Sequence, residues 1–164
     1  MKNITSTLLL AALTLSPSIL TAEPTATYSE KKTEKKKADQ EITIEANDQM
    51  QFNKKELEVK AGETVKLTLT HVGKLPKAAM GHNLVILKKD TYLVSGPQKA
   101  MPAAATDYIP ADEESKKAVV AHTKVIGGGE SDTITFSIAE AGEYEYLCSF
   151  PGHFAIMKGK ITVK

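Results

Sequence analysis

The chain has one cysteine, no arginine and no tryptophan among its 164 residues. A single cysteine excludes an internal disulfide, so a folded domain has to be held together by its core alone. The chain has 21 basic residues, all of them lysines, and 20 acidic residues, which gives a net charge of +1. That balance disfavours nucleic-acid binding, which needs a strongly basic face.

The chain also lacks an apolar run long enough to span a membrane. Residues 1–22 instead have the pattern of a secretory signal, with Lys2 before an apolar core and small residues leading to Ala22. A retained membrane anchor is the alternative, but Ser16-Pro17-Ser18 interrupts the apolar run. We therefore expect export to the periplasm, cleavage near Ala22 and no transmembrane segment in the mature chain.

Residues 23–40 are rich in lysine and glutamate and almost lack large apolar side chains. Such a stretch cannot bury enough surface to offset its chain entropy, so it is predicted to be a flexible tether. Contact with an anionic surface is the alternative, weakened because nearby acidic residues cancel much of the lysine charge. Residues 41–164 hold 15 lysines and 16 acidic residues, a net charge of 15 − 16 = −1, and are predicted to form one domain.

Short alternating runs separated by turns predict an all-β, Greek-key sandwich for this domain. Thr64 to Thr70 alternates most clearly, and the apolar run from His82 to Leu87 is expected to be an interior strand. A strand is also expected from Val119 to Ile126. The pattern fails at residues 90–117, where alanines could support helical turns but prolines break any long helix, so this region is predicted to be an irregular flap with one short helix.

The most informative segment is Cys148-Ser-Phe-Pro-Gly-His153-Phe-Ala-Ile-Met157, which places a thiolate, an imidazole and a thioether in one loop. A second imidazole, His82, lies upstream in Met80-Gly81-His82-Asn83. Two histidines, one cysteine and a weak axial methionine suit a single copper ion that cycles between Cu(I) and Cu(II). His82, Cys148, His153 and Met157 are therefore the candidate metal ligands.

Each candidate has a plainer interpretation. Cys148 alone could be a buried apolar thiol or a nucleophile, Met157 could be core packing, and His82 could be a satisfied core histidine. Their combination favours ligation, because a methionine adds nothing to thiol catalysis. Two other histidines, His71 and His122, are not expected to be ligands; His71 is expected to be partly buried and His122 to lie on a strand face.

Two neighbours of His82 have expected supporting roles. Gly81 lacks a side chain where backbone approaches the metal closely, so its carbonyl is expected to face the metal. Asn83 is expected to tie this segment to the Cys148 loop by hydrogen bonds. Backbone N–H groups near Ser149 and Phe150 are expected to donate to the thiolate.

These motifs resemble the azurins, blue copper proteins with the cupredoxin fold, over nearly all of residues 41–164. The resemblance implies that His82, Cys148 and His153 form a trigonal set, with Met157 as a long axial ligand and the Gly81 carbonyl opposite. It further implies that electrons pass through His153, within an apolar docking patch for c-type cytochromes or a terminal reductase. The expected patch residues are Met80, Met101, Phe150, Pro151 and Ala155.

The chain departs from the azurin pattern in three ways: it cannot form the usual disulfide, it has no tryptophan after the His-Asn pair, and it carries the tether. The expected function is that of an exported one-electron carrier, not an enzyme. A copper storage or delivery protein with the same ligands is the main alternative. A thiol enzyme using Cys148 and His153 is a weaker one.

Overall fold

The computed structural model of the chain describes residues 37–91 and 105–164. The predicted signal peptide 1–22, most of the predicted tether and Met101 lie outside the described residues. No helix in the described ranges is long and apolar enough to cross a membrane.

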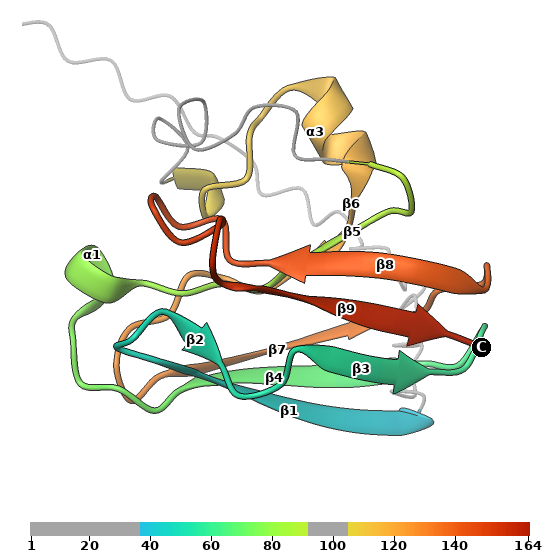
Figure 1. Cartoon of the computed structure of the whole chain (residues 1–164), viewed down its shortest axis with the longest axis horizontal. Coiled ribbons are helices and arrows are strands. Elements are labelled where there is room, and N and C mark those ends of the chain that lie inside the picture. The colour runs from blue at the N-terminus through green and yellow to red at the C-terminus, as the bar shows by residue number, and fades with distance from the viewer. Residues whose placement is uncertain (1–36, 92–104) are drawn as a thin grey trace, which may run out of the picture. The chain divides into compact units, whose positions relative to one another are not determined.

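In the described residues, nine strands form two sheets that pack face to face as a β-sandwich (Figure 1). The first sheet contains, in spatial order, β2 (Gln51–Phe52), β1 (Gln40–Asn47), β4 (Val65–His71) and β7 (Ser131–Phe136). The second contains β3 (Glu56–Val59), β9 (Lys158–Val163), β8 (Gly142–Leu147), β5 (Val85–Leu87) and β6 (Val119–His122). The predicted all-β sandwich is confirmed.

The core lies between the two sheets and follows from the period-two pattern of the strands. In β4, Val65, Leu67 and Leu69 point inward and are almost fully buried, while the lysine and threonines between them face outward. Burying a leucine side chain of this kind contributes roughly 1.5–3 kcal/mol. β1 pairs with β4 in parallel, so that Ile42 lies opposite Leu67 and Ile44 opposite Leu69.

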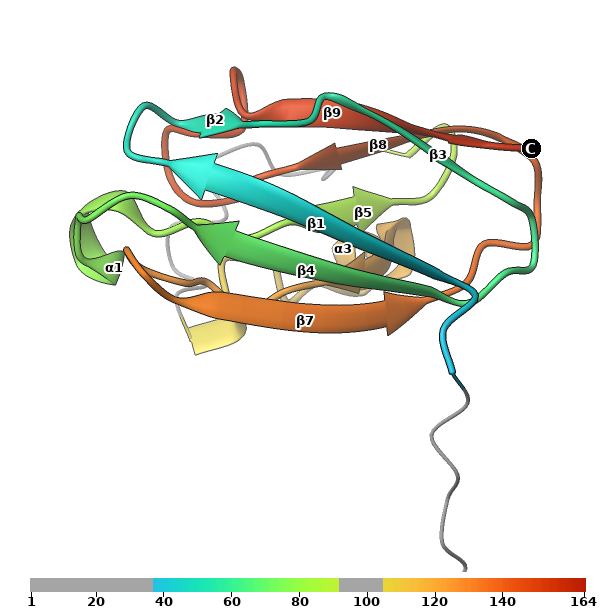
Figure 2. The same ribbon diagram turned by 90° about the horizontal axis from the view of Figure 1, so that it is seen from below.

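The two poles of the sandwich differ in what they carry. The chain enters and leaves at one pole, where Asp39 N–H donates to Thr64 O and Ala61 N–H donates to Lys164 O. The helix α1 (Lys77–Met80) and the connection from β8 to β9 lie at the other pole (Figures 1 and 2). All four predicted metal ligands are on segments that reach this second pole.

The predicted flap contains the expected short helix, α3 (Glu113–Ala118), and Ala105 lies in a short helical turn. The alanines at 100, 103 and 104 lie outside the described residues. Asp112 caps α3 by accepting a hydrogen bond from Ser115 N, with acidic residues in the first turn and lysines in the last. This order complements the helix dipole. The sequence analysis did not identify this cap, and Pro110, which lies before it, does not disturb the helix.

Two predicted strands are shorter than expected. The apolar run from His82 contributes only β5, all of it buried. The strand predicted for Val119–Ile126 ends at His122, and Ile126 instead forms an isolated bridge with His82. In both places the chain leaves regular pairing as it approaches the second pole, where side chains have to converge.

Gly159 in β9 provides a test of the core packing. Tyr146 is fully buried, its hydroxyl donates to Lys54 O, and a Cβ at Gly159 would overlap its ring and the Lys55 carbonyl. We predict that Gly159→Ala lowers the free energy of unfolding by about 1–3 kcal/mol through overpacking. Urea unfolding followed by circular dichroism measures this. Lys160→Thr, at an exposed position of the same strand, is the control, and an equal midpoint for both variants contradicts the packing.

Candidate metal centre

His82 is fixed by its backbone and its ring together. Its N–H and carbonyl form the bridge with Ile126, at 3.0 and 2.8 Å, just before β5 begins. Its Nε2 atom lies 2.9 Å from Asn47 O, and a carbonyl can only accept, so Nε2 carries the proton. The Nδ1 atom is therefore left with a free lone pair that points away from β1.

The loop after β8 brings its side chains to the same place. Cys148 N–H donates to Met157 O at 2.9 Å, and His153 O accepts from Met157 N–H at 2.9 Å. Gly152 has a φ of +85°, which a residue with a side chain rarely adopts, so the loop can turn tightly between the cysteine and His153. This closed turn holds the ends of the C-x4-H-x3-M motif side by side.

Three donor atoms from the two segments meet in a buried site. His82 Nδ1 lies 3.2 Å from His153 Nδ1, and Cys148 Sγ lies 3.9 Å from His82 Nδ1 and 3.7 Å from His153 Nδ1. The side chains of His82 and Cys148 are 0% exposed and His153 is 4% exposed. In the described ranges these three residues are the group of histidine, cysteine or acidic side chains whose geometry could hold a metal ion.

The electrostatics of the site suit a metal ion. Desolvation lowers the pKa of His82 to about 4 and also lowers the pKa of His153. Both imidazoles are thus neutral at pH 7, as ligands need to be. Burial raises the pKa of the Cys148 thiol to about 11, so the thiol keeps its proton until a cation displaces it. Two neutral imidazoles and one soft sulfur fit copper.

Met157 and Gly81 complete the surroundings of the three donors. Met157 is 1% exposed and belongs to the same core cluster as Cys148. A side chain at Gly81 would collide with Lys77 O, Val125 and the Phe150 ring, so only glycine fits there. The backbone before His82 therefore packs directly against the loop that carries His153.

Asn83 links the two ligand-bearing segments. Its Oδ1 atom accepts from Ser149 N–H and its Nδ2 atom donates to Ser149 Oγ, both at 2.8 Å. The expected donors to the cysteine sulfur need one correction. They are the backbone N–H groups of Phe150 and Asn83, since that of Ser149 is already used by Asn83.

Sequence reasoning missed Asp107, which secures the same junction from the flap. Its carbonyl accepts from Asn83 Nδ2 at 2.7 Å, and its Oδ1 atom accepts from Val125 N–H at 2.8 Å. Asp107 and Tyr108 both have positive φ, at 54° and 58°, which is uncommon for residues with side chains. Tyr108 then packs edge-on against Phe150. No sequence signal marks this turn, because neither residue is a glycine.

His71 is more buried than expected. It is fully buried at the end of β4, with its ring edge-on to the His82 ring at a centroid distance of 4.5 Å. Its Nε2 atom lies 3.2 Å from Asp48 Oδ1, but neither ring nitrogen makes a well-aligned hydrogen bond within the described chain. His122 is exposed on β6, as predicted.

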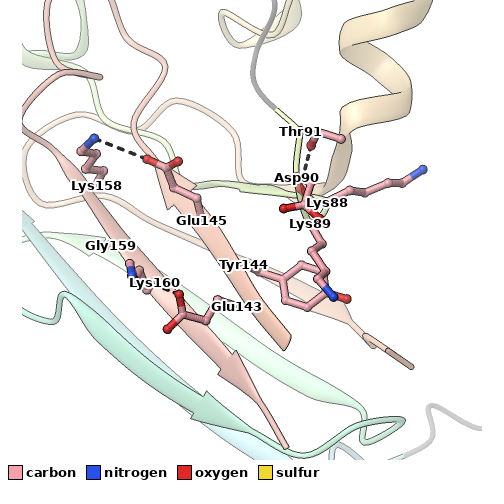
Figure 3. Close-up of a pocket in the computed structure, with 10 residues that line it drawn as sticks. All are labelled: Lys88, Lys89, Asp90, Thr91, Glu143, Tyr144, Glu145, Lys158, Gly159 and Lys160. Atoms are coloured by element: carbon pink, nitrogen blue, oxygen red, sulfur yellow. Dashed lines mark hydrogen bonds and ion pairs between the residues drawn. The ribbon is translucent and has the colours of Figure 1, made fainter. Parts of the chain in front are cut away.

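A polar groove on the second sheet is separate from this centre. Its walls include residues 88–91 and strands β8 and β9, and the lysines of β9 pair with glutamates of β8 (Figure 3). Lys158 pairs with Glu145 at 3.7 Å and Lys160 with Glu143 at 3.1 Å. The groove contains none of the three donor residues.

Comparison with known proteins decides the family. Residues 38–164 match the model of copper binding proteins of the plastocyanin/azurin family. This chain belongs to that family. It is 46% identical over 127 residues to an azurin from Alcaligenes faecalis, which covers 75% of this chain and 97% of that protein.

Two further relatives carry additional information. Outer membrane protein H.8 from Neisseria meningitidis serogroup B is 49% identical over 125 residues, which are 74% of this chain and 66% of that protein. Reduced auracyanin from Roseiflexus castenholzii has a similar solved structure, with a TM-score of 0.66 and 33% identity over 78% of this chain and 99% of that one. Membership in this family makes copper the cofactor and the chain a type 1 copper electron carrier, not an enzyme.

The lowered histidine pKa values predict how the metal-free chain responds to acid. As pH falls from about 6.5 to about 4, the unfolded chain takes up a proton that folded His82 resists. The free energy of unfolding should therefore drop by about 1.4 kcal/mol per pH unit for this residue, and His153 adds to the loss.

Urea unfolding of the metal-free chain at several pH values measures the slope. His82→Leu should flatten it, and His122→Gln, at an exposed position, should leave it unchanged. Equal slopes for all three chains would mean that His82 is not buried as a neutral imidazole.

Proposed function

We propose that His82 Nδ1, Cys148 Sγ and His153 Nδ1 are the equatorial ligands of the copper ion, with Met157 as the axial ligand and the Gly81 carbonyl opposite it. The convergence of three buried donor atoms within 4.8 Å of one another supports this assignment. The hydrogen bond from His82 Nε2 to Asn47 O supports the choice of ring nitrogen. When bound, the copper accepts and releases one electron.

The residues around the site hold the ligand-bearing segments in place, so a change in the charge of the copper requires little movement of the chain. Asn83 bonds both the backbone and the side chain of Ser149, so the ligand segments cannot move apart without breaking two buried hydrogen bonds. The Phe150 and Asn83 N–H groups direct positive dipoles at the sulfur and stabilise its thiolate form. The closed shell of side chains excludes water.

Partners are proposed to be redox proteins such as c-type cytochromes or a terminal reductase, docking over His153. Ala155 is exposed and Ile156 is 59% exposed beside it, which supports an apolar contact there. The expected docking patch needs a correction at Phe150. Phe150 is 8% exposed and its ring packs against that of His153. It therefore supports the His153 ring and contributes little area to the docking patch.

Export to the periplasm is proposed from the signal-like residues 1–22. A related protein is named an outer membrane protein, which is consistent with export in this family. Copper delivery is less well supported than electron transfer, because ligands that are 0–4% exposed cannot pass a metal readily to another protein. The thiol-enzyme alternative is excluded by the family.

The direct test is an optical titration with Cu(II) followed by reduction with ascorbate. An intense visible band that saturates at one equivalent and bleaches reversibly is the expected result. A weak band, or oxidation of the thiol by the added copper, would contradict a preassembled site and favour copper delivery.

We predict that Cys148→Ser abolishes the intense visible band while the domain stays folded, because the band requires thiolate–copper charge transfer. Visible absorption and circular dichroism measure the two effects. Ser149→Ala, at the neighbouring position, should keep the band. An intense band in Cys148→Ser would rule out this ligand.

We predict that Met157→Leu retains copper but shifts the reduction potential, since an axial ligand tunes the potential of such sites. Protein voltammetry measures the potential. Ile156→Leu, exposed beside it, is the matched control and should leave the potential unchanged. If both variants have the wild-type potential, Met157 is core packing and not an axial ligand.

A further inference from the structure

The segment before His82 exposes large apolar side chains. No residue of the helix α1 is buried, and every residue from Lys74 to Ala79 is exposed. Val72 and Leu75 are 54% and 41% exposed, which is high for large aliphatic side chains. We refer to residues 72–80 as the α1 platform.

Although it is exposed, the α1 platform is tightly held. Asp48 accepts hydrogen bonds from Lys74 N–H at 2.8 Å and Leu75 N–H at 3.3 Å, and Leu75 O accepts from Gly128 N–H at 2.9 Å. A side chain at Gly127 or Gly128 would collide with the platform backbone, so the two segments are in direct contact. A surface fixed before contact loses little entropy when a partner binds.

The α1 platform lies next to the metal centre. Lys77 O packs against Gly81, the residue before His82. Figures 1 and 2 show α1 at the pole that also carries the β8–β9 connection, away from the ends of the described chain. A partner that covers this platform is therefore close to the proposed copper ligands.

The two lysines of the α1 platform differ from those of β9 in their pairing. Lys74 and Lys77 are exposed and make no ion pair with a described residue, whereas those of β9 pair with glutamates of β8 (Figure 3). Two nearby carboxylates accept hydrogen bonds from backbone N–H groups instead of pairing with these lysines: Asp48 from Lys74 and Leu75, and Glu130 from Gly127. The ammonium groups of Lys74 and Lys77 are thus exposed positive charges of this segment, unpaired within the described part of the chain.

We propose that the α1 platform is the part of the docking surface that selects the charge of the partner, and that it fits a redox protein with acidic side chains beside an apolar contact. This proposal rests on the electron-carrier function proposed above. Val72 and Leu75 supply apolar contact, and Lys74 and Lys77 attract the acidic groups. Charges at the rim of a small, transient interface act mainly on the rate of association.

Local charge can dominate here because the domain as a whole is nearly neutral, at −1 for residues 41–164. At an ionic strength of 0.1 M charges are screened beyond about 10 Å, so a partner at this pole responds to Lys74 and Lys77 more than to lysines at the far pole. The far pole offers matched control residues. Lys37 and Lys60 are exposed there, and reversing either pair changes the net charge by the same amount.

The first test is independent of electron transfer. The Cu(I) form of the full chain is diamagnetic, so the paramagnetic anion hexacyanochromate(III) can be mapped by broadening of backbone amide NMR signals. Broadening centred on residues 72–80 and lost in Lys74→Glu/Lys77→Glu is expected. Uniform broadening, or broadening centred elsewhere, would overturn the proposal.

The second test measures oxidation of the Cu(I) chain by hexacyanoferrate(III), in which one electron passes from copper to iron. At low ionic strength Lys74→Glu/Lys77→Glu should slow this reaction by about tenfold, and Lys37→Glu/Lys60→Glu should slow it far less. With the cation tris(phenanthroline)cobalt(III) the platform variant should react faster than wild type. Lys74→Gln/Lys77→Gln should show smaller changes in the same directions.

The outcomes separate the two proposals. A chain without the reversible visible band fails the electron-carrier proposal itself. A chain with that band, but with equal rates for the platform and far-pole variants, fails only the proposal for the α1 platform. It would then indicate a neutral partner held by apolar contact alone.

Discussion

Three potential ligand atoms lie within 4.8 Å of one another in a buried site, and the rest of the second pole depends on how this crowding is tolerated. Without a metal ion, the protonated Cys148 thiol can donate to one imidazole at a time, while the two Nδ1 atoms, 3.2 Å apart, have no proton to share because burial penalises the protonated form of each histidine. The close approach of the two imidazole nitrogens therefore persists because the surrounding chain holds them there. Regular β pairing gives way at this pole to make room for that scaffold.

The scaffold consists of hydrogen bonds between segments that are far apart in sequence. Asn47, at the end of β1, accepts a hydrogen bond from the His82 ring. Asn83 donates to Ser149 in the loop after β8, and it also donates to the carbonyl of Asp107 in the flap. Each link is buried or partly buried, so breaking it leaves a polar group without a partner, at a cost of about 1–3 kcal/mol. A rigid ligand set follows, and rigidity suits a centre that changes charge without changing shape.

The sequence was a good guide to the layers and a poorer guide to the irregular parts. Alternation in β4 and the apolar run of β5 predicted the sandwich, because inward and outward side chains repeat every two residues. The motif from Cys148 to Met157 predicted three of the candidate ligands for a similar reason, since they lie in one loop. Asp107 was missed because its role depends on a carbonyl and a left-handed backbone, which side-chain identity does not reveal. The burial of His71 was underestimated because its ring packs against that of His82, a contact between segments that the sequence pattern does not reveal.

The arrangement of the two poles has a consequence for how this domain can be combined with other polypeptides. The described chain enters beside Thr64 and its last residue lies next to Ala61, both at the pole away from the metal centre. The two ends of the described chain and the metal centre therefore lie at opposite poles of the sandwich. A peptide bond made at either end thus does not pass through the hydrogen bonds that hold the ligand-bearing segments.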